Sequence, residues 1–479
     1  MSSFYWYDLE TFGISPQFDR IAQFAGIRTD LQLNPVGTPD MFYCQPTLDT
    51  FADPEACLIT GITPQDCQKK GLLETQFMGK INDIFSESHT CVVGYNSMRF
   101  DDEFIRYGNY RNLIDPYMRE WARGNSRWDI IDMLRACYAL RPEGINWAYR
   151  EPGEPSFKLT DLTKANNLTH EAAHDALSDV QATIDVARLI KQKQPKLFEF
   201  CLQLRNKNYV KTLLNWQLQK PIVHVSNKIP AKRGCLAIML PLAMHPSNAN
   251  GIICYDLSSD PHDLFNLDVE EIRDRIFTPT QDLPEDCPRI PLKTIHLNKS
   301  PFISPLSVLK GVDLARINLD YEQVKQNLQL FKTQDSSALI VKTQAVFSQK
   351  FDNDNDDVDT LLYAGFFSSK EKSLFNEIRK LPAQKIKSDY FNYNFQDNRA
   401  KQLIFNYCAR NFPEILSAKE TQQWHKNISS RLNYRFGENA HSWFEKLNLL
   451  KSSDLTDSQK QMLNQLEKSM QQQLHTINS

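Results

Sequence analysis

The sequence lacks long hydrophobic runs. No stretch approaches the ~18 to 20 consecutive apolar residues that a membrane-spanning helix needs. The N-terminus also lacks a basic segment followed by an apolar stretch and a cleavage site. These absences argue against a membrane protein and against a secreted one, and we expect a cytoplasmic protein with no membrane partner.

Paired cysteines and an excess of glycine or proline are also missing. The ten cysteines are scattered with no CxxC pair, which argues against a zinc site or a disulfide scaffold and predicts reduced, mostly buried thiols. Glycine and proline contribute only 16 and 24 of the 479 residues, as in globular proteins rather than collagen-like or disordered chains. At about 150 residues per domain, this length predicts roughly three domains.

Acidic residues are absent from Phe200 to Tyr255, although Asp and Glu make up 58 of the 479 residues. This acid-free segment carries the basic residues Arg205, Lys207, Lys211, Lys220, Lys228, Lys232 and Arg233. The net charge of −3 gives no sign of a nucleic-acid partner, but a local positive field of this kind is typical of a phosphate-binding surface. A solvated surface that lacks acids by chance is the alternative.

The first 195 residues alternate strand-like and helix-like patterns. Short apolar runs predict strands, and apolar residues at helical spacing predict helices. The expected strands are Phe4–Leu9, Ile21–Arg28, Met41–Gln45 and Cys91–Asn96, and the expected helices are Glu74–Phe85, Asp101–Tyr107, Ile130–Leu140 and Asp175–Ile190. Strands that are followed by alternating strands and helices predict a mixed α/β sheet covered by helices.

The remaining chain divides into two further regions. Residues 196–350 contain short apolar runs separated by Pro, Asn and Gly, which predict a β-rich domain with helical insertions. Residues 351–479 begin with a run of Asp and Asn and continue in long helical patterns, which predict an α-helical domain. The expected domains are therefore residues 1–195, 196–350 and 351–479.

Two carboxylates stand two positions apart in the first expected strand. Asp8 and Glu10 follow an otherwise aromatic run, Phe4 to Tyr7. Alternate side chains of a strand share a face, so both carboxylates are expected to point the same way. Because they repel one another unless a cation lies between them, the pair predicts a site for a hard divalent ion. Two acids in a loop at the end of a strand are the alternative.

Further acids follow at positions where helices are expected to begin. Asp101 comes after the strand at 91–96, and Asp179 lies near the start of the helix at 175–190. His174 precedes Asp179 by five residues and is expected in the lead-in to that helix, where a histidine beside carboxylates fits a general base. A structural histidine is the alternative.

These motifs carry a family resemblance. The order Asp-x-Glu, Asn-x-x-x-Phe-Asp and His-x4-Asp resembles the DEDD exonuclease superfamily with a histidine base. The phrases DLETFG, AQFAGIRTD, GYNSMRFDDE, RACYALRPEGINW, AHDALSDV, HPSNAN and FNYCARNFP resemble the bacterial exonuclease I family along the whole chain. The resemblance implies a ribonuclease H-like α/β exonuclease domain, a β-rich SH3-like domain and an α-helical C-terminal domain. It also implies processive 3′-to-5′ degradation of single-stranded DNA to 5′-mononucleotides, in DNA repair and recombination.

The resemblance assigns catalytic roles residue by residue. It implies that the metal ligands are Asp8, Glu10, Asp101 and Asp179, that His174 is the base, and that Glu10 also contacts substrate. Two Mg²⁺ ions would serve, for which Mn²⁺ is expected to substitute, one activating the attacking water and one stabilising the leaving 3′ oxygen. Motif position favours Asp101 over its neighbour Asp102, which we expect to cap the following helix.

The resemblance also implies contacts with DNA and with a partner protein. The expected DNA contacts are Lys158, Arg106, Tyr117, Trp121, Arg135, Lys207, Asn250, Lys293 and Asn298, which combine cations with rings on which bases stack. Arg141 and Phe200 are expected to bind the acidic C-terminal tail of single-stranded DNA-binding protein. Phe200 stands where the family has Tyr, and the basic positions around Lys310 align poorly. The protein is expected to be a monomer.

Two other functions use the same residues. An RNA 3′-exonuclease of the same superfamily needs the same five catalytic residues and differs in how it treats the 2′-OH. A catalytically silent single-strand-binding scaffold is the alternative of a different class, and it would normally lack one of the carboxylates, all of which are present.

Overall fold

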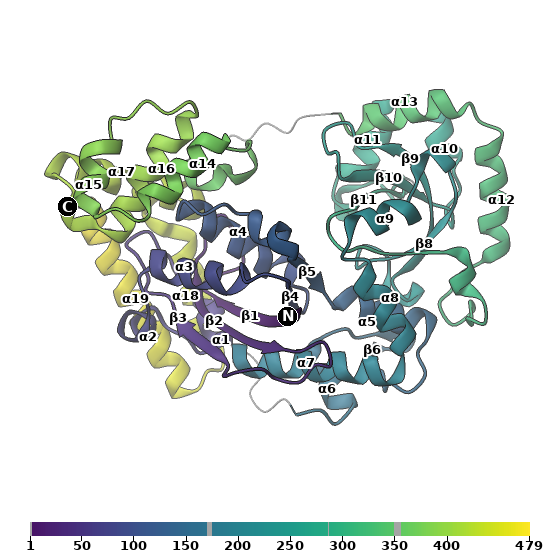
Figure 1. Cartoon of the computed structure of the whole chain (residues 1–479), viewed down its shortest axis with the longest axis horizontal. Helices are drawn as coiled ribbons and strands as arrows, with labels where there is room; N and C mark the ends of the chain where they lie inside the picture. Colours follow the sequence, from purple (N-terminus) through teal and green to yellow (C-terminus); the bar gives the residue numbers. More distant parts are fainter. Residues whose placement is uncertain (1, 170–174, 286, 349–355) are drawn as a thin grey trace. The chain divides into compact units, whose positions relative to one another are not determined.

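A computed structural model describes residues 2–169, 175–285, 287–348 and 356–479 (Figure 1). Its described residues form two compact units. The first unit draws on Met1–Ser126, Glu171–Gln181 and Asn353–Ser479, and the second on Arg127–His170 and Ala182–Asp352. The domain boundaries at residues 195 and 350 stay predictions.

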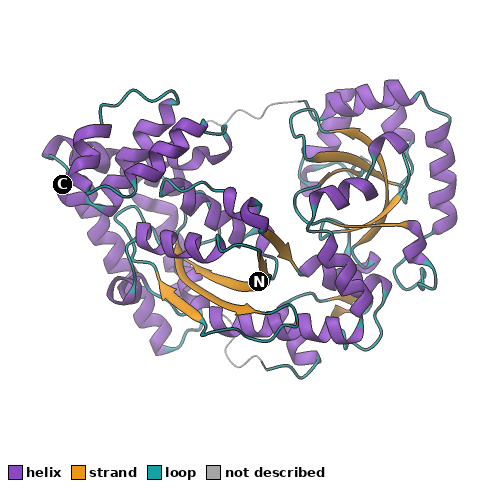
Figure 2. Ribbon diagram, in the orientation of Figure 1, coloured by secondary structure: helices purple, strands orange, loops and turns teal. Residues whose placement is uncertain are grey.

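The N-terminal sheet has five strands in the order β3-β2-β1-β4-β5, so that β1 is the middle strand (Figure 2). Strand β1 pairs antiparallel with β2 and parallel with β4, as the alternating pattern predicts for a mixed sheet. The strands are β1 Ser3–Thr11, β2 Ile21–Thr29, β3 Asp40–Tyr43, β4 Thr90–Gly94 and β5 Ser126–Asp129.

The helices between residues 54 and 213 belong partly to the first unit and partly to the second. They are α1 Pro54–Thr60, α2 Pro64–Lys70, α3 Glu74–Phe85, α4 Asp101–Arg111, α5 Ile131–Leu140, α6 Leu159–Ala165, α7 Ala176–Lys193, α8 Pro195–Gln203 and α9 Lys207–Leu213. Apolar side chains of β1, β2 and β4, such as Tyr5, Phe24 and Val92, pack against Phe77 of α3 and Phe104 of α4 in one buried cluster. The expected strands and helices of this region are thus present, with ends that differ by a few residues.

The second unit contains an antiparallel sheet in the order β11-β10-β9-β8-β12. Its strands are β8 Ile222–Val225, β9 Leu236–Met244, β10 Gly251–Asp256, β11 Leu292–His296 and β12 Phe302–Pro305, and a small hairpin pairs β6 Tyr149–Glu151 with β7 Glu154–Pro155. The helical insertions are α10 His262–Asn266, α11 Val269–Phe277, α12 Tyr321–Lys332 and α13 Ser336–Val346.

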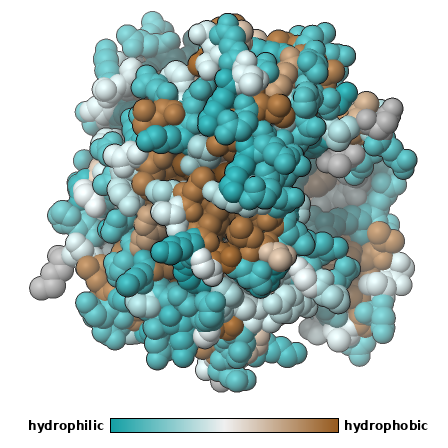
Figure 3. All heavy atoms as spheres, turned by 90° about the vertical axis from the view of Figure 1, so that its right-hand side faces the viewer, coloured by the Kyte–Doolittle hydropathy of each residue, from teal (hydrophilic) through white to brown (hydrophobic). Residues whose placement is uncertain are grey.

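The face drawn in Figure 3 is largely hydrophilic, with hydrophobic side chains gathered near its middle. Among the described residues of the second unit, the exposed large hydrophobic side chains are Tyr149, Leu218, Phe277 and Val341.

The C-terminal region is helical, as its periodicity predicts. Its helices are α14 Ser369–Ile378, α15 Ala383–Tyr390, α16 Asn398–Asn411, α17 Ala418–Phe436, α18 His441–Lys451 and α19 Asp457–Asn478. Capping boxes begin α14, α17 and α19 at Ser368, Ser417 and Thr456, which satisfies amide groups that a helix start leaves unpaired. Helices α16 to α19 share one buried apolar cluster with Phe12, Phe51 and Cys57 of the N-terminal region, whereas Phe375 of α14 and Ile386 of α15 belong to a second cluster with Tyr107 of α4.

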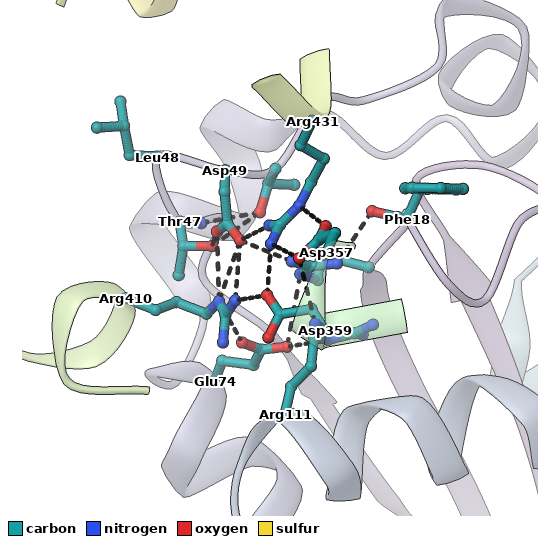
Figure 4. A network of polar contacts seen from close by, with 12 residues as sticks. Phe18, Thr47, Leu48, Asp49, Glu74, Arg111, Asp357, Asp359, Arg410 and Arg431 are labelled. Atoms are coloured by element: carbon teal, nitrogen blue, oxygen red, sulfur yellow. Dashed lines mark hydrogen bonds and ion pairs between the residues drawn. The ribbon is translucent and has the colours of Figure 1, made fainter. Parts of the chain in front are cut away.

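A buried charge network also joins the C-terminal helices to the N-terminal sheet within the first unit (Figure 4). Asp49 accepts hydrogen bonds from Arg20, Arg410 and Arg431 at 2.7, 3.0 and 2.6 Å. Asp359 accepts from Arg410 and Arg431 at 2.5 and 2.7 Å. Burial alone would raise the pKa of Asp49, but the guanidinium charges, that of Arg410 foremost, hold it well below its usual range.

All ten cysteines lie in described parts of the chain, no disulfide joins any of them, and all but Cys287 are buried. Among the described residues, no helix combines the length and the apolar character needed to cross a bilayer.

Candidate active site

Three carboxylates gather at the end of the middle strand of the N-terminal sheet. Asp8 and Glu10 lie on β1, and Asp179 lies in the first turn of α7. One oxygen of each lies within 4.8 Å of the others. The pairing register shifts between Glu10 and Thr11, where one step along β1 is matched by two steps along β2, from Gln23 to Ile21. An irregularity of this kind bends the strands locally, beside the carboxylates.

Asp101 approaches the same site from a neighbouring element. It is the first residue of α4, which follows β4 through a short 3₁₀ turn, Ser97–Arg99. Asp101 is buried, and after burial itself its charge is the largest influence that raises the pKa of Asp8. The structure therefore brings the four predicted carboxylates into one electrostatic neighbourhood.

The electrostatics fit a site for cations. Burial, together with the charges of Asp8 and Asp179, raises the pKa of Glu10 to about 9. Burial and the charges of Asp101 and Asp179 raise the pKa of Asp8 well above its usual range. Several buried carboxylates with mutual repulsion and oxygen donors are the ligand set that hard divalent ions prefer. The residues present thus suit the implied Mg²⁺.

Asp102 has a different role from its neighbour Asp101. Its carboxylate accepts hydrogen bonds from the Tyr7 hydroxyl at 3.0 Å and from Arg119 at 2.7 Å, all three side chains being buried. No side-chain hydrogen bond caps α4, so the prediction that Asp102 caps this helix is wrong. The reason is that a buried guanidinium occupies its carboxylate.

His174 lies outside the described residues, and its assignment as a base stays a prediction. The sequence reasoning overlooked Asp175, whose carboxylate accepts from the Ser178 amide at 3.1 Å and whose charge contributes to the raised pKa of Glu10. Its place in the phrase AHDALSDV, next to His174 and four residues before Asp179, was the available signal.

Two of the predicted DNA contacts of the first unit lie together. Arg106 is buried and donates two hydrogen bonds to Glu120, at 2.8 and 3.0 Å, and one to Glu103, at 2.9 Å. The charge of Glu120 in particular holds the pKa of Arg106 above its usual range despite burial. The guanidinium also stacks 5.3 Å from the ring of Tyr117. Arg106 is therefore held by acids, in an arrangement that fixes the Tyr117 ring.

Trp121 is 69% exposed, which suits a stacking surface. The sequence reasoning missed Phe366, which is 78% exposed and meets Tyr117 edge-on at 5.5 Å. Two adjacent phenylalanines in a polar stretch, Phe366 and Phe367, were the available signal.

The predicted contacts on the second unit have varied surroundings. Arg135 is buried and donates to Asp132 at 2.6 Å, whereas Lys158 is exposed at the start of α6. Lys207, half-buried at the start of α9, has a pKa lowered by burial and by the charge of Lys211.

The other predicted contacts lie on or near β10 and β11. The Lys293 ammonium lies 2.7 Å from Nε2 of the buried His224. The backbone carbonyl of Asn250 accepts a hydrogen bond from the Leu297 amide at 2.8 Å. Asn298, the residue after Leu297, is exposed.

The predicted partner-binding residues are both half-buried. Arg141 follows the last residue of α5 and donates to the Val308 carbonyl at 3.1 Å. Phe200, on α8, meets Phe302 and Tyr209 edge-on, with ring centres 6.0 and 6.4 Å apart.

Comparison with known proteins agrees with this architecture. Family models match an exonuclease domain at residues 5–187, an exonuclease I SH3-like domain at 205–349 and an exonuclease I C-terminal domain at 356–473. Exodeoxyribonuclease I of Haemophilus influenzae is 44% identical over 432 residues, which are 90% of each chain. That of Escherichia coli is 43% identical over 429 residues, 88% of each chain.

Solved structures extend the similarity to the fold. An exonuclease I from Methylocaldum szegediense matches with a TM-score of 0.93 and 44% identity, covering 99% of this chain and 100% of that one. E. coli exonuclease I in complex with a dA16 oligonucleotide matches with a TM-score of 0.93, 38% identity and the same coverage. A zinc-bound complex of the E. coli enzyme with single-stranded DNA gives a TM-score of 0.92 at 39% identity, again covering 99% and 100%.

The fold and these matches define an exonuclease, and the carboxylate cluster is its candidate active site. The chain belongs to the exodeoxyribonuclease I family, whose reaction is the 3′-to-5′ hydrolysis of single-stranded DNA. The predicted family and fold class are confirmed.

Proposed function

We propose that this protein degrades single-stranded DNA processively from the 3′ end to 5′-mononucleotides, using Asp8, Glu10, Asp101 and Asp179 to hold two Mg²⁺ ions. The observation that carries the proposal is the convergence of three carboxylates within 4.8 Å at the end of β1. When bound, Mg²⁺ supplies a more acidic water and stabilises charge on the leaving oxygen. The side chains of the four acids present the carboxylate oxygens that hold the ions, and Glu10 also contacts the terminal nucleotide.

His174 is proposed to take the proton of the attacking water. A positioned general base typically contributes about 10² to 10⁴-fold to a rate, so His174→Ala should lose activity in that range and still bind single-stranded DNA. A turnover rate that stays unchanged between pH 6 and 9 in the variant and in the parent alike would remove the assignment.

Exposed rings and cations of each unit are proposed to hold the strand. Trp121 and Phe366 offer exposed faces in the first unit, and the acid-free segment offers positive charge in the second. Stacking on rings and contact with phosphates both tolerate any sequence. This combination supports a processive enzyme that does not select bases.

The decisive experiment replaces Asp8 with Ala and follows nucleotide release from 3′-labelled and 5′-labelled single strands in Mg²⁺ and in Mn²⁺. Release should be abolished with both metals, whereas binding of the strand in EDTA should persist. Asp83→Ala, which removes an exposed acid of α3, is the control and should behave like the parent. Near-normal release by Asp8→Ala in Mg²⁺ would overturn the proposed site.

Equal-length DNA and RNA oligonucleotides distinguish the two substrate classes. We expect rapid release from DNA and little from RNA, because a site that fits deoxyribose closely excludes the 2′-OH. Faster release from RNA would favour the RNA exonuclease instead.

The proposed setting is a cytoplasmic monomer, active in DNA repair and recombination, that Arg141 and Phe200 connect to the tail of single-stranded DNA-binding protein. A terminal carboxylate and a guanidinium form a strong charge-assisted hydrogen bond, and the Phe200 ring offers apolar contact. Sedimentation at micromolar protein concentration tests whether the protein is a monomer.

A further inference from the structure

We infer that Arg435, on helix α17 of the C-terminal region, is a positioning residue for the active site. Its ion pair with Asp19 fixes the loop of residues 12–19, which begins directly after the register shift between Glu10 and Thr11. The inference rests on the proposed metal-binding roles of Glu10 and Asp101, and it gives the C-terminal helices a part in the reaction.

The loop is closed tightly at its base. The Phe12 amide donates to the Arg20 carbonyl at 2.9 Å, and the Thr11 hydroxyl donates to the Gly13 carbonyl at 2.6 Å. These bonds lie immediately beyond the register shift between Glu10 and Thr11. The loop joins β1 to β2 at this irregularity, which bends the paired strands, so a change in the loop alters the aim of the Glu10 carboxylate.

The Asp19 carboxylate supports the loop from inside. Asp19 is only 2% exposed, and it accepts a hydrogen bond from the Ser15 amide at 2.8 Å. A Cβ atom on Gly13 would lie 2.2 Å from an Asp19 carboxylate oxygen, so the backbone passes directly over this group. The loop conformation therefore depends on a charge that is removed from water.

Arg435 supplies the compensating charge. Its guanidinium lies 2.6 Å from the Asp19 carboxylate and 4.5 Å from the centre of the Phe436 ring. The ring of Phe18, on the same loop, packs 5.9 Å from that of Tyr434. A buried carboxylate that loses its partner cation must find water or a proton, and either change would open the loop.

The other side of the loop is anchored on α4, the helix that begins with Asp101. Arg111 donates to the Pro16 carbonyl at 3.1 Å, and the side-chain amide nitrogen of Gln17 donates to the Tyr107 hydroxyl at 3.1 Å. The loop thus connects the strand of Asp8 and Glu10 with the helix of Asp101. Its position influences the spacing of the carboxylates that both elements carry.

The test compares Arg435→Met with the parent, because Met keeps an apolar stem against Phe436 and removes the charge. At a temperature well below the unfolding midpoint of each variant, kcat should fall by about 10- to 100-fold, as misplaced reacting groups cause. The KM for a long single strand should stay within about twofold of the parent value. The loop positions the catalytic groups and does not bind the rest of the DNA strand. Amide exchange at Phe12, Ser15 and Asp19 should accelerate.

Two further variants separate positioning from general stability. Lys451→Met removes an ion pair of the same length, 2.6 Å, which is partly exposed and joins α18 to Glu467 of α19. It should leave kcat and loop exchange unchanged. Asp19→Asn combined with Arg435→Met removes both charges of the pair, while Asn can still accept from Ser15. The double variant should therefore recover most of the turnover that the single variant loses.

Unchanged kcat and loop exchange in Arg435→Met would overturn the inference. So would a double variant as slow as the single one, because Arg435 would then act by some route other than Asp19. The proposed site is judged separately by Asp8→Ala. If Asp8→Ala is inactive and Arg435→Met matches the parent, only the positioning inference fails.

Discussion

Arg410 and Asp49 are separated by 361 residues in the chain, yet a guanidinium nitrogen of Arg410 lies 3.0 Å from a carboxylate oxygen of Asp49, and both side chains are fully buried. Asp49 belongs to the segment after β3, and Arg410 belongs to α16. The contact ties the C-terminal helices to the sheet that carries the active site, within the first unit. Buried ion pairs of this kind specify one arrangement because leaving either charge alone is costly.

Asp49→Asn should destabilise the protein strongly. It leaves Arg20, Arg410 and Arg431 with one carboxylate fewer, and removal of one partner from a buried pair costs about 3–5 kcal/mol. The thermal midpoint, measured by circular dichroism, should fall markedly, whereas Lys385→Met, which breaks the exposed pair with Asp389, should change it little. An Asp49→Asn protein as stable as the parent would contradict the role of the network.

Asp101→Asn and Asp102→Asn should fail in different ways. Asp101→Asn should lose turnover and keep its thermal midpoint, because it removes a proposed metal ligand. Asp102→Asn should lower the midpoint, since the buried Arg119 loses its carboxylate partner, and it should keep a larger share of turnover at a temperature where both variants are folded. The reverse pattern would exchange the two assignments.

Stability should fall on mild acidification through His296. Burial, then the charge of Lys299, lowers the pKa of this imidazole from 6.5 to about 4. Below pH 6.5 the unfolded chain therefore binds a proton that the folded chain does not bind, so this contribution to stability is complete above pH 6.5 and declines toward pH 4. At about 1.4 kcal/mol per pKa unit, the loss is at most about 3.5 kcal/mol.

His296→Asn should flatten this dependence, because Asn cannot titrate but keeps an acceptor toward Asn248, whose amide lies 3.4 Å from the imidazole. Thermal midpoints between pH 7 and 4.5 provide the measurement. The exposed His475 serves as a control when it is replaced by Asn. Parallel pH curves for the parent and His296→Asn would rule out this histidine as the source.

Arg141→Ala should bind a peptide of the single-stranded DNA-binding protein tail much more weakly than the parent does. Alanine cannot replace the charge-assisted contact with a terminal carboxylate. Titration calorimetry measures the affinity, and the nearby exposed Arg150 replaced by Ala is the control. Equal affinities for the parent and Arg141→Ala would remove the partner site without affecting the nuclease assignment.

Lys207→Gln combined with Lys211→Gln should weaken the holding of long strands and shorten each processive run. For every phosphate of single-stranded DNA that the variant no longer neutralises, the salt slope of binding should fall by roughly 0.7. Cleavage of a very short oligonucleotide should change little. Lys332→Gln, an exposed lysine of α12, is the control. Equal losses on long and short substrates, or an unchanged slope, would identify the acid-free segment as an ordinary solvated surface.

The spacing of residues along the chain was enough to predict the carboxylate pair of Asp8 and Glu10. Both lie on one strand, where a period of two residues fixes the shared face, and that period is a local property. The same holds for helix α3, whose observed bounds equal the predicted Glu74–Phe85. Family motifs, rather than spacing, supplied Asp101 as the ligand and single-stranded DNA as the substrate.

The tertiary structure alone decided which charges are paired inside the protein. Asp102 differs from Asp101 by one position, yet it lies against Arg119 rather than capping its helix. Asp19 obtains its partner from α17, which no local pattern connects to the first strand. Local periodicity depends on backbone geometry over a few residues, whereas the partner of a buried charge depends on which distant segments the packing of the whole unit brings together.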